Sequence, residues 1–184
     1  MSGVAPLLAF DQTLRAWVVA HRIGALDGIM WTLSAVGRGG LIWLLLAAIL
    51  VVWGRLQRSA ALSLVLAVLI GSLTADHVLK PIVHRSRPFV EAPKVRVIGG
   101  RPDDPSFPSG HATNAFAGAF VLSALAAAPA ILWWLLAIAI AYSRVYVGVH
   151  YPLDVTAGAL LGLAAGGIAV TVYRRWVRSA APQA

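Results

Sequence analysis

The chain has 184 residues, of which 59% are hydrophobic, a share that excludes an ordinary water-facing fold, while the length allows a single domain over residues 1–184. Fifteen Lys and Arg against seven Asp and Glu leave a formal net charge of +8, which suits anionic lipid headgroups or phosphates; the apolar content argues against nucleic acid as a partner. Cysteine is absent, which excludes disulfides and thiolate metal sites.

The N-terminal segment 6–23 places apolar residues at helical spacing and charged residues on its other faces. We expect it to lie at the membrane interface as an amphipathic helix or to form a sixth, poorer span. No cleavable signal peptide is evident there, because Asp11, Arg15 and His21 fall within the apolar stretch.

Five apolar runs follow that are candidates for membrane helices, since a hydrocarbon core of roughly 30 Å needs about 20 mostly apolar residues. They lie at about 41–53 with an extension back toward 29, 59–79, 112–128, 131–141 with a continuation toward 147, and 155–173. The sequence therefore predicts an all-α, polytopic transmembrane helix bundle with five to six spans.

Basic residues in the short loops predict the orientation of these spans. The turn at 54–58 and the tail at 174–178 are basic and fall on one side, which we assign to the cytoplasmic side of the inner (cytoplasmic) membrane. The polar segments 80–111 and 143–154 then face the outer, periplasmic side. Six Lys or Arg between 80 and 104 break the positive-inside trend, which suggests that these charges serve a ligand; an inverted topology is the alternative.

Three polar motifs lie at the predicted outer ends of the spans: KPIVHRSRP at 80–88, PSGH at 108–111 and SRVYVGVHYPLD at 143–154. Any single residue in them has an ordinary explanation as a helix cap or a snorkelling side chain. Because all three fall on the same side of the membrane, we expect them to converge on one site.

The second motif has the features of an anion site at a helix start. Pro108 and Gly110 shape a turn, and Ser109 can cap the following helix, whose free N–H groups attract negative charge. His111 lies in the first turn, where its imidazole can donate to an oxyanion or protonate a leaving oxygen.

The third motif adds a nucleophile with an orienting carboxylate. Asp154 follows His150 by four residues in the first turn of the last helix, so it can hold the Nδ1 proton and leave Nε2 free to attack. Lys80, Arg87 and Arg144 would supply positive charge for the oxygens of a transferring phosphoryl group.

In order and spacing these motifs match K-x6-RP, PSGH and SR-x5-H-x3-D, so the chain resembles the type 2 phosphatidic acid phosphatase (PAP2) family. The resemblance implies a PAP2/haloperoxidase-like helical core and hydrolysis of a lipid phosphomonoester or diphosphate through a phosphohistidine, with neither metal nor cofactor. It implies His150 as nucleophile, Asp154 as its partner and His111 as general acid. The phosphate-binding residues that it implies are Lys80, Arg87, Ser109, Gly110 and Arg144.

The expected substrate is a lipid with a terminal phosphate: polyprenyl (undecaprenyl) diphosphate, phosphatidylglycerol phosphate or phosphatidic acid. Outward orientation favours the polyprenyl carrier.

An alternative is a non-catalytic protein that binds or moves phospholipids, although simple binding needs no His150–Asp154 pair. Haloperoxidases share such a pocket but are soluble. Around the motifs, Asp76 can pair with Lys80 at i,i+4 and position it, or it is a simple interfacial residue, whereas Arg85 is expected to add charge without a fixed role.

Overall fold

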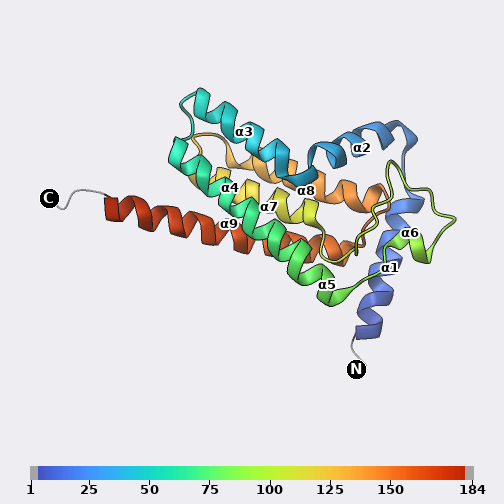
Figure 1. The fold of residues 1–184 in the computed structure, drawn as a ribbon. Coiled ribbons are helices and arrows are strands. Elements are labelled where there is room, and N and C mark those ends of the chain that lie inside the picture. The colour runs from blue at the N-terminus through green and yellow to red at the C-terminus, as the bar shows by residue number, and fades with distance from the viewer. Residues whose placement is uncertain (1–3, 181–184) are drawn as a thin grey trace.

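Long apolar helices lie side by side in the computed structural model of the protein, which describes residues 4–180 (Figure 1). The longer helices are α1 (Val4–Ala20), α2 (Asp27–Val36), α3 (Leu41–Val52), α4 (Arg58–Leu73), α7 (Gly110–Leu125), α8 (Ala130–Tyr146) and α9 (Pro152–Ala180). Shorter helical segments are η1 (Gly24–Leu26), η2 (Arg38–Gly40), η3 (Thr74–Leu79, a π-helix), α5 (Lys80–Val83) and α6 (Pro88–Glu91). No strand occurs between residues 4 and 180, and the predicted all-α fold is confirmed. The predicted domain, 1–184, includes 1–3 and 181–184, which lie outside the described residues.

Helices α7 and α9 pack closely because α9 presents glycine at four-residue intervals. Gly158, Gly162 and Gly166 face α7, and a Cβ atom at Gly158 would come within 2.5 Å of the carbonyl oxygen of Ser109. Small residues at this spacing let two helix backbones approach each other. The starts of the two helices are thereby held together, and the Ser109 N–H donates to the Asp154 carbonyl at 2.9 Å.

A bend of 57° separates α2 from α3, where a single span extending back toward residue 29 was expected. Gly39 and Gly40 adopt positive φ angles of 59° and 74° at this bend, a backbone conformation that favours glycine. A Cβ atom at Gly37 would lie 3.4 Å from the His111 ring. The bend therefore brings the segment η2 against the first turn of α7.

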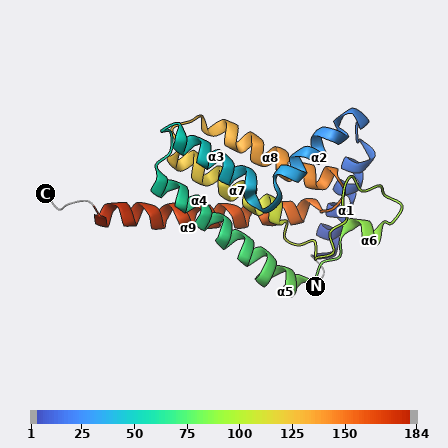
Figure 2. The same cartoon turned by 45° about the horizontal axis from the view of Figure 1, so that its top comes forward.

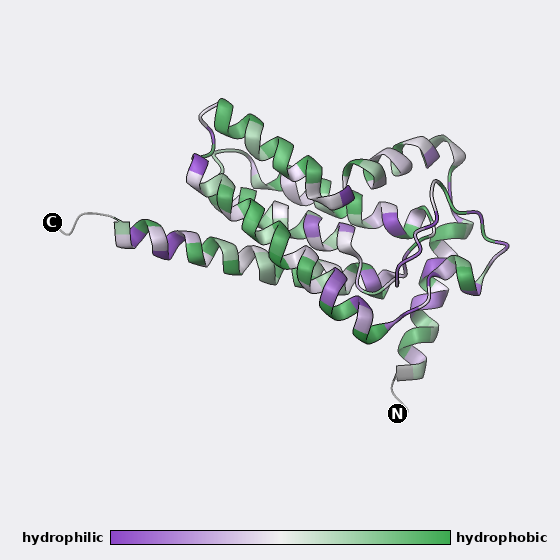
Figure 3. Ribbon diagram, viewed as in Figure 1, coloured by the Kyte–Doolittle hydropathy of each residue, from purple (hydrophilic) through white to green (hydrophobic). Residues whose placement is uncertain are grey.

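The described helices meet the requirements for crossing a membrane to different degrees. The continuous stretch Arg58–Glu91 and helix α9 are long and apolar enough, and the bent pair α2 and α3 can count as a third span. Helix α8 is apolar but has only 17 residues. The apolar residues follow the length of the bundle and the polar ones gather mainly at its loop-rich end (Figure 3). The span count of five to six stays a prediction.

Helix α1 lies across the loop-rich end of the bundle, as two views show (Figures 1 and 2). Most of its apolar side chains point outward, with Phe10 65% and Trp17 57% exposed, while Asp11, Arg15 and Val18 are buried against the protein. A helix that meets lipid with its apolar face and protein with its polar face is suited to the membrane interface. The pose favours the interfacial alternative over a sixth span.

Candidate active site

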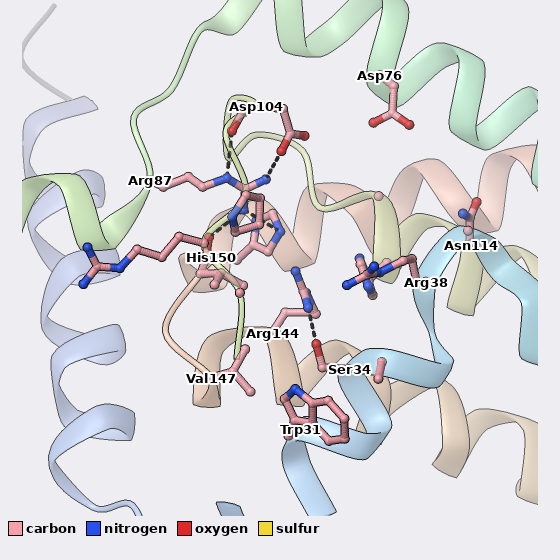
Figure 4. Close-up of a pocket in the computed structure, with 18 of the residues that line it drawn as sticks. Trp31, Ser34, Arg38, Asp76, Arg87, Asp104, Asn114, Arg144, Val147 and His150 are labelled. Atoms are coloured by element: carbon pink, nitrogen blue, oxygen red, sulfur yellow. Dashed lines mark hydrogen bonds and ion pairs between the residues drawn. The ribbon is translucent and has the colours of Figure 1, made fainter. Parts of the chain in front are cut away.

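A cavity of about 460 Å³ opens at the loop-rich end, between α2 and η2, the 98–104 loop, the start of α7 and the segment that joins α8 to α9 (Figure 4). It brings together side chains from all three motifs. The predicted site residues that line it are Lys80, Arg87, Gly110, His111, Arg144 and His150. Ser109 and Asp154 are fully buried and do not line the cavity.

His150 lies in the segment between α8 and α9 and is 2% exposed. Its Nε2 lies 3.3 Å from an Nη1 of Arg87, and because a guanidinium can only donate, we assign the lone pair to Nε2 and the proton to Nδ1. Burial and the positive charges of Arg144, Arg87 and Lys80 lower the pKa of His150 well below its usual value. The imidazole is therefore neutral at pH 7, with its unprotonated Nε2 facing the cations.

Asp154 stands behind His150 in the first turn of α9, as predicted, and the helix begins at Pro152. Its Oδ2 lies 3.5 Å from His150 Nδ1, which makes no hydrogen bond within the described residues, and accepts the Tyr151 N–H at 2.9 Å. Its Oδ1 accepts from Arg85 Nη1 at 2.7 Å. Arg85, for which the sequence indicated no fixed role, therefore directly fixes this carboxylate.

Two of the three cations of the first motif, Lys80 and Arg87, share a carboxylate. Lys80 Nζ contacts Asp76 Oδ1 and Asp104 Oδ2, both at 2.5 Å, which confirms the predicted Asp76–Lys80 pair. Asp104 Oδ1 also pairs with Arg87 Nη2 at 2.7 Å. Burial raises the pKa of Asp104, but the hydrogen bond from Lys80 and the charges of Arg87 and Lys80 outweigh it and lower the pKa to about 2.

This role of Asp104 was not predicted from the sequence. The residue lies 17 positions after Arg87 in a stretch without regular helix, so no helical periodicity points to the contact. The carboxylate occupies the position between Lys80 and Arg87 that a phosphate would share.

The second motif builds the start of α7. Ser109 caps the helix, as predicted, by accepting from the Ala112 N–H at 3.5 Å. The cap holds Gly110 and His111 at the cavity wall. His111 is contacted by the backbone of Ser34 from α2, and its Nε2 is buried with no hydrogen-bond partner within the described part of the chain. This nitrogen is available to a substrate.

The opposite side of the cavity carries two arginines: Arg144, from the third motif, and Arg38, which belongs to no motif. Arg144 is buried and donates to the Ser34 hydroxyl, while Arg38 extends from η2 into the cavity (Figure 4). Arg38 lies close enough to His111 and Arg144 for its charge to act on both. Between residues 4 and 180 it makes no ion pair. The Gly-rich stretch around it was the only signal in the sequence.

The chain is similar to known proteins both in sequence and in fold. The model of the PAP2 superfamily matches residues 59–178. The undecaprenyl-diphosphatase of Sulfolobus acidocaldarius is 35% identical over 161 residues, which cover 84% of this chain and 74% of that protein. The crystal structure of Aquifex aeolicus LpxE has a TM-score of 0.74 at 28% identity and covers 86% of this chain and 93% of its own. A transmembrane PAP2-type phosphatidylglycerolphosphate phosphatase from Bacillus subtilis shares the fold, with a TM-score of 0.74 at 22% identity over 92% of this chain and 87% of its own.

A bundle of apolar helices with a cationic, histidine-containing cavity at one end defines a class of membrane phosphatases, and this chain belongs to the PAP2 superfamily. It is an integral membrane enzyme that hydrolyses lipid phosphates. Its fold is that of the transmembrane members.

Proposed function

We propose that the protein removes the terminal phosphate of a lipid diphosphate, with polyprenyl (undecaprenyl) diphosphate as the favoured substrate, through a phosphohistidine on His150. The observation that carries the proposal is the neutral imidazole of His150, with Nε2 among the cations of the cavity and Asp154 behind Nδ1. Binding phosphate needs cations and N–H groups but no oriented nucleophile. This arrangement supports catalysis.

In the first proposed step, the Nε2 lone pair of His150 attacks the terminal phosphorus and a P–N bond forms as the bond to the leaving oxygen breaks. His111 donates a proton to that oxygen. Lys80, Arg87 and Arg144 stabilise the charge on the transferring group, and the Gly110 N–H adds a donor from the start of α7.

In the second proposed step, water attacks the phosphorus and gives its proton to His111. The P–N bond breaks, orthophosphate leaves, and its electron pair returns to Nε2 of His150. Asp154 keeps the Nδ1 proton in place throughout, so the same tautomer is ready for the next turnover.

The charge of the cavity supports a diphosphate over a monophosphate. Five cationic side chains line it, namely Arg38, Lys80, Arg87, Arg101 and Arg144, against the carboxylates of Asp76 and Asp104. Arg38 is on the side of His111, where the leaving group would lie. A leaving phosphate would present negative charge to Arg38, whereas an alcohol would present none. The similarity to an undecaprenyl-diphosphatase points the same way.

We also propose that the cavity faces the periplasmic side of the inner membrane. The α3–α4 turn and the C-terminal end of α9 lie at the end of the bundle opposite the cavity (Figure 1), and both carry basic residues. Lys80 and Arg87 in the outer segment are buried, Arg85 is partly buried, and all three pair with carboxylates, which accounts for three of the six basic residues that break the positive-inside trend.

The proposal is tested with the purified protein in detergent and EDTA. We expect it to release phosphate from C55 diphosphate, and His150→Ala to lower kcat by about 10⁴-fold or more. Brief incubation with ³²P-labelled substrate should label the wild type and not the variant. His21→Ala, which changes an exposed histidine directly after α1, is the matched control and should retain full activity. Full activity of His150→Ala contradicts the mechanism.

The preference for a diphosphate is tested separately. Arg38→Met should lower kcat/KM for C55 diphosphate about tenfold more than for phosphatidic acid or phosphatidylglycerol phosphate, because it removes one charge-assisted contact to the leaving phosphate. Arg58→Met, an exposed arginine at the opposite end, serves as the control. Equal losses on both classes of substrate would contradict the assignment of Arg38.

A further inference from the structure

The buried carboxylate on α1 belongs to no motif and plays no part in the mechanism above. Asp11 is 1% exposed, although it lies one residue from Phe10, which is among the most exposed apolar side chains of α1. Burying a carboxylate is expensive unless it is paired and hydrogen-bonded. The partners of Asp11 therefore indicate what the residue does.

Both oxygens of Asp11 bind elements of the catalytic end. Oδ1 accepts the Leu153 N–H at 2.8 Å, in the first turn of α9. Oδ2 pairs with Arg85 Nη2 at 2.5 Å. The other end of the same guanidinium, Nη1, pairs with Asp154 Oδ1 at 2.7 Å. Asp11, Arg85 and Asp154 thus form a continuous chain of charges that ends beside His150.

The guanidinium between the two carboxylates is itself held in place. The Arg85 Cζ atom lies 3.9 Å from the centre of the Tyr151 ring, a distance typical of a cation–π contact. The Tyr151 backbone N–H meets the other oxygen of Asp154 at 2.9 Å. The tyrosine and the arginine together therefore fix the orientation of the Asp154 carboxylate.

The summed charge of Asp11, Arg85 and Asp154 contributes to the electrostatic field at His150, on the side opposite the cations of the cavity. Arg85 alone would neutralise Asp154, and with Asp11 the three groups carry a net charge of −1. When His150 attacks phosphorus, positive charge develops on its imidazole, 3.5 Å from Asp154. A net negative charge among buried groups stabilises this form, and charge interactions are stronger there than in water.

We infer that Asp11 and Arg85 are positioning residues for the reaction, and that α1 acts through them to maintain the orientation and the net negative charge of the Asp154 group beside His150. This inference rests on the proposed role of His150 as nucleophile. It gives the N-terminal helix a part in catalysis although none of its residues lines the cavity.

Two variants distinguish an effect of the net charge near His150 from a purely structural effect of Asp11. Asp11→Asn changes the summed charge of residues 11, 85 and 154 from −1 to 0 with little change in shape. The double variant Asp11→Asn with Arg85→Met restores this sum to −1. We expect Asp11→Asn to lower kcat by about 10- to 100-fold, the range found for residues that orient reacting groups from behind. KM should stay within about twofold, because the phosphate-binding cations are unchanged.

The double variant should recover at least about threefold in kcat over Asp11→Asn. Thr13→Ala is the matched control, since it removes an exposed side-chain hydrogen bond within α1, the 2.9 Å bond to the Ala9 carbonyl, without touching the chain of charges. It should keep wild-type kcat. Counting active sites by ³²P trapping corrects every kcat for misfolded protein.

Two results would overturn the inference: a kcat of Asp11→Asn within twofold of wild type, or a double variant no better than the single one. A double variant no better than the single one would mean that Asp11 only supports the structure and does not act through its charge. His150→Ala is measured in the same series, because retained activity in that variant refutes the proposed nucleophile and leaves the outcome for Asp11 separate.

Discussion

The two walls of the cavity carry similar cations in different electrostatic settings. The paired wall consists of Lys80 and Arg87 with the carboxylates of Asp76 and Asp104. The unpaired wall consists of Arg144, which donates to the Ser34 hydroxyl, and Arg38, which makes no ion pair within the described residues.

This difference shows that the number of cations does not by itself describe an anion site. On the paired wall, carboxylates orient the cations and cancel most of their charge before a substrate arrives. On the unpaired wall, the charge is left for the substrate. We expect the first arrangement to provide geometry and the second to provide net attraction for phosphate.

The largest effect is expected on the paired wall, because removing a cation there also exposes carboxylates. Lys80→Met would leave Asp76 and Asp104 facing the substrate phosphate, and kcat/KM should fall by more than about 10³-fold. Adding Asp104→Asn to this variant should recover part of the loss, which steady-state kinetics on the two variants would show. A double variant worse than the single one would mean that Asp104 serves the substrate in another way.

A smaller effect is expected for the same kind of change on the unpaired wall. Arg144→Met removes one charge and frees only the Ser34 hydroxyl, so kcat/KM should fall by about 10²- to 10³-fold, as for loss of a single oxyanion donor. Neutralising Asp104 in this background should give no recovery comparable to that in Lys80→Met. Similar recoveries in both backgrounds would show that the two walls do not differ.

Removing the shared carboxylate should make the paired wall resemble the unpaired one. In Asp104→Asn, Lys80 and Arg87 lose an anion, so inorganic phosphate should inhibit about fivefold more tightly, with a lower kcat because Arg87 is less well oriented. Inhibition constants measured at two salt concentrations report both changes. Weaker inhibition than in the wild type would contradict the idea that Asp104 competes with phosphate.

The smallest effect concerns His150, where the walls meet. Burial and the charges of Arg144, Arg87 and Lys80 lower its pKa below the ordinary 6.5, so as pH falls below 6.5 the unfolded chain binds a proton that the folded protein excludes. Stability should therefore fall with pH by at most about 1.4 kcal/mol per unit in this window. Thermal unfolding of His150→Gln should show a weaker decline between pH 7.5 and 5.5. An unchanged decline would assign the effect to other groups.

Local features of the site could be predicted from the sequence because they depend on spacing along one helix or turn. The Asp76–Lys80 pair is an i,i+4 contact, the Ser109 cap spans three residues, and the α9 start follows from Pro152. The motifs also predicted the family, since the order and spacing of their residues are rarely met by chance. Their convergence on one cavity was expected from their common side of the membrane.

The bend between α2 and α3 shows why other features were out of reach. An apolar run with glycines is compatible with one long span, and only the packing of Gly40 against Val68 and the α7 start turns it into two helices 57° apart. The position of Arg38 in the cavity depends on that bend.

The sequence by itself determined that the chain lies in a lipid bilayer, which segments form its apolar helices, and which residues are candidates for handling phosphate. The local spacing of those residues does not depend on how the spans are arranged. The tertiary structure alone decided which charges meet. Asp104 reaches Lys80 across 24 positions and Asp11 reaches Arg85 across 74, through backbone without a repeating pattern. Such contacts form because buried charges must find partners, and which partner lies within reach is decided only when the helices have packed.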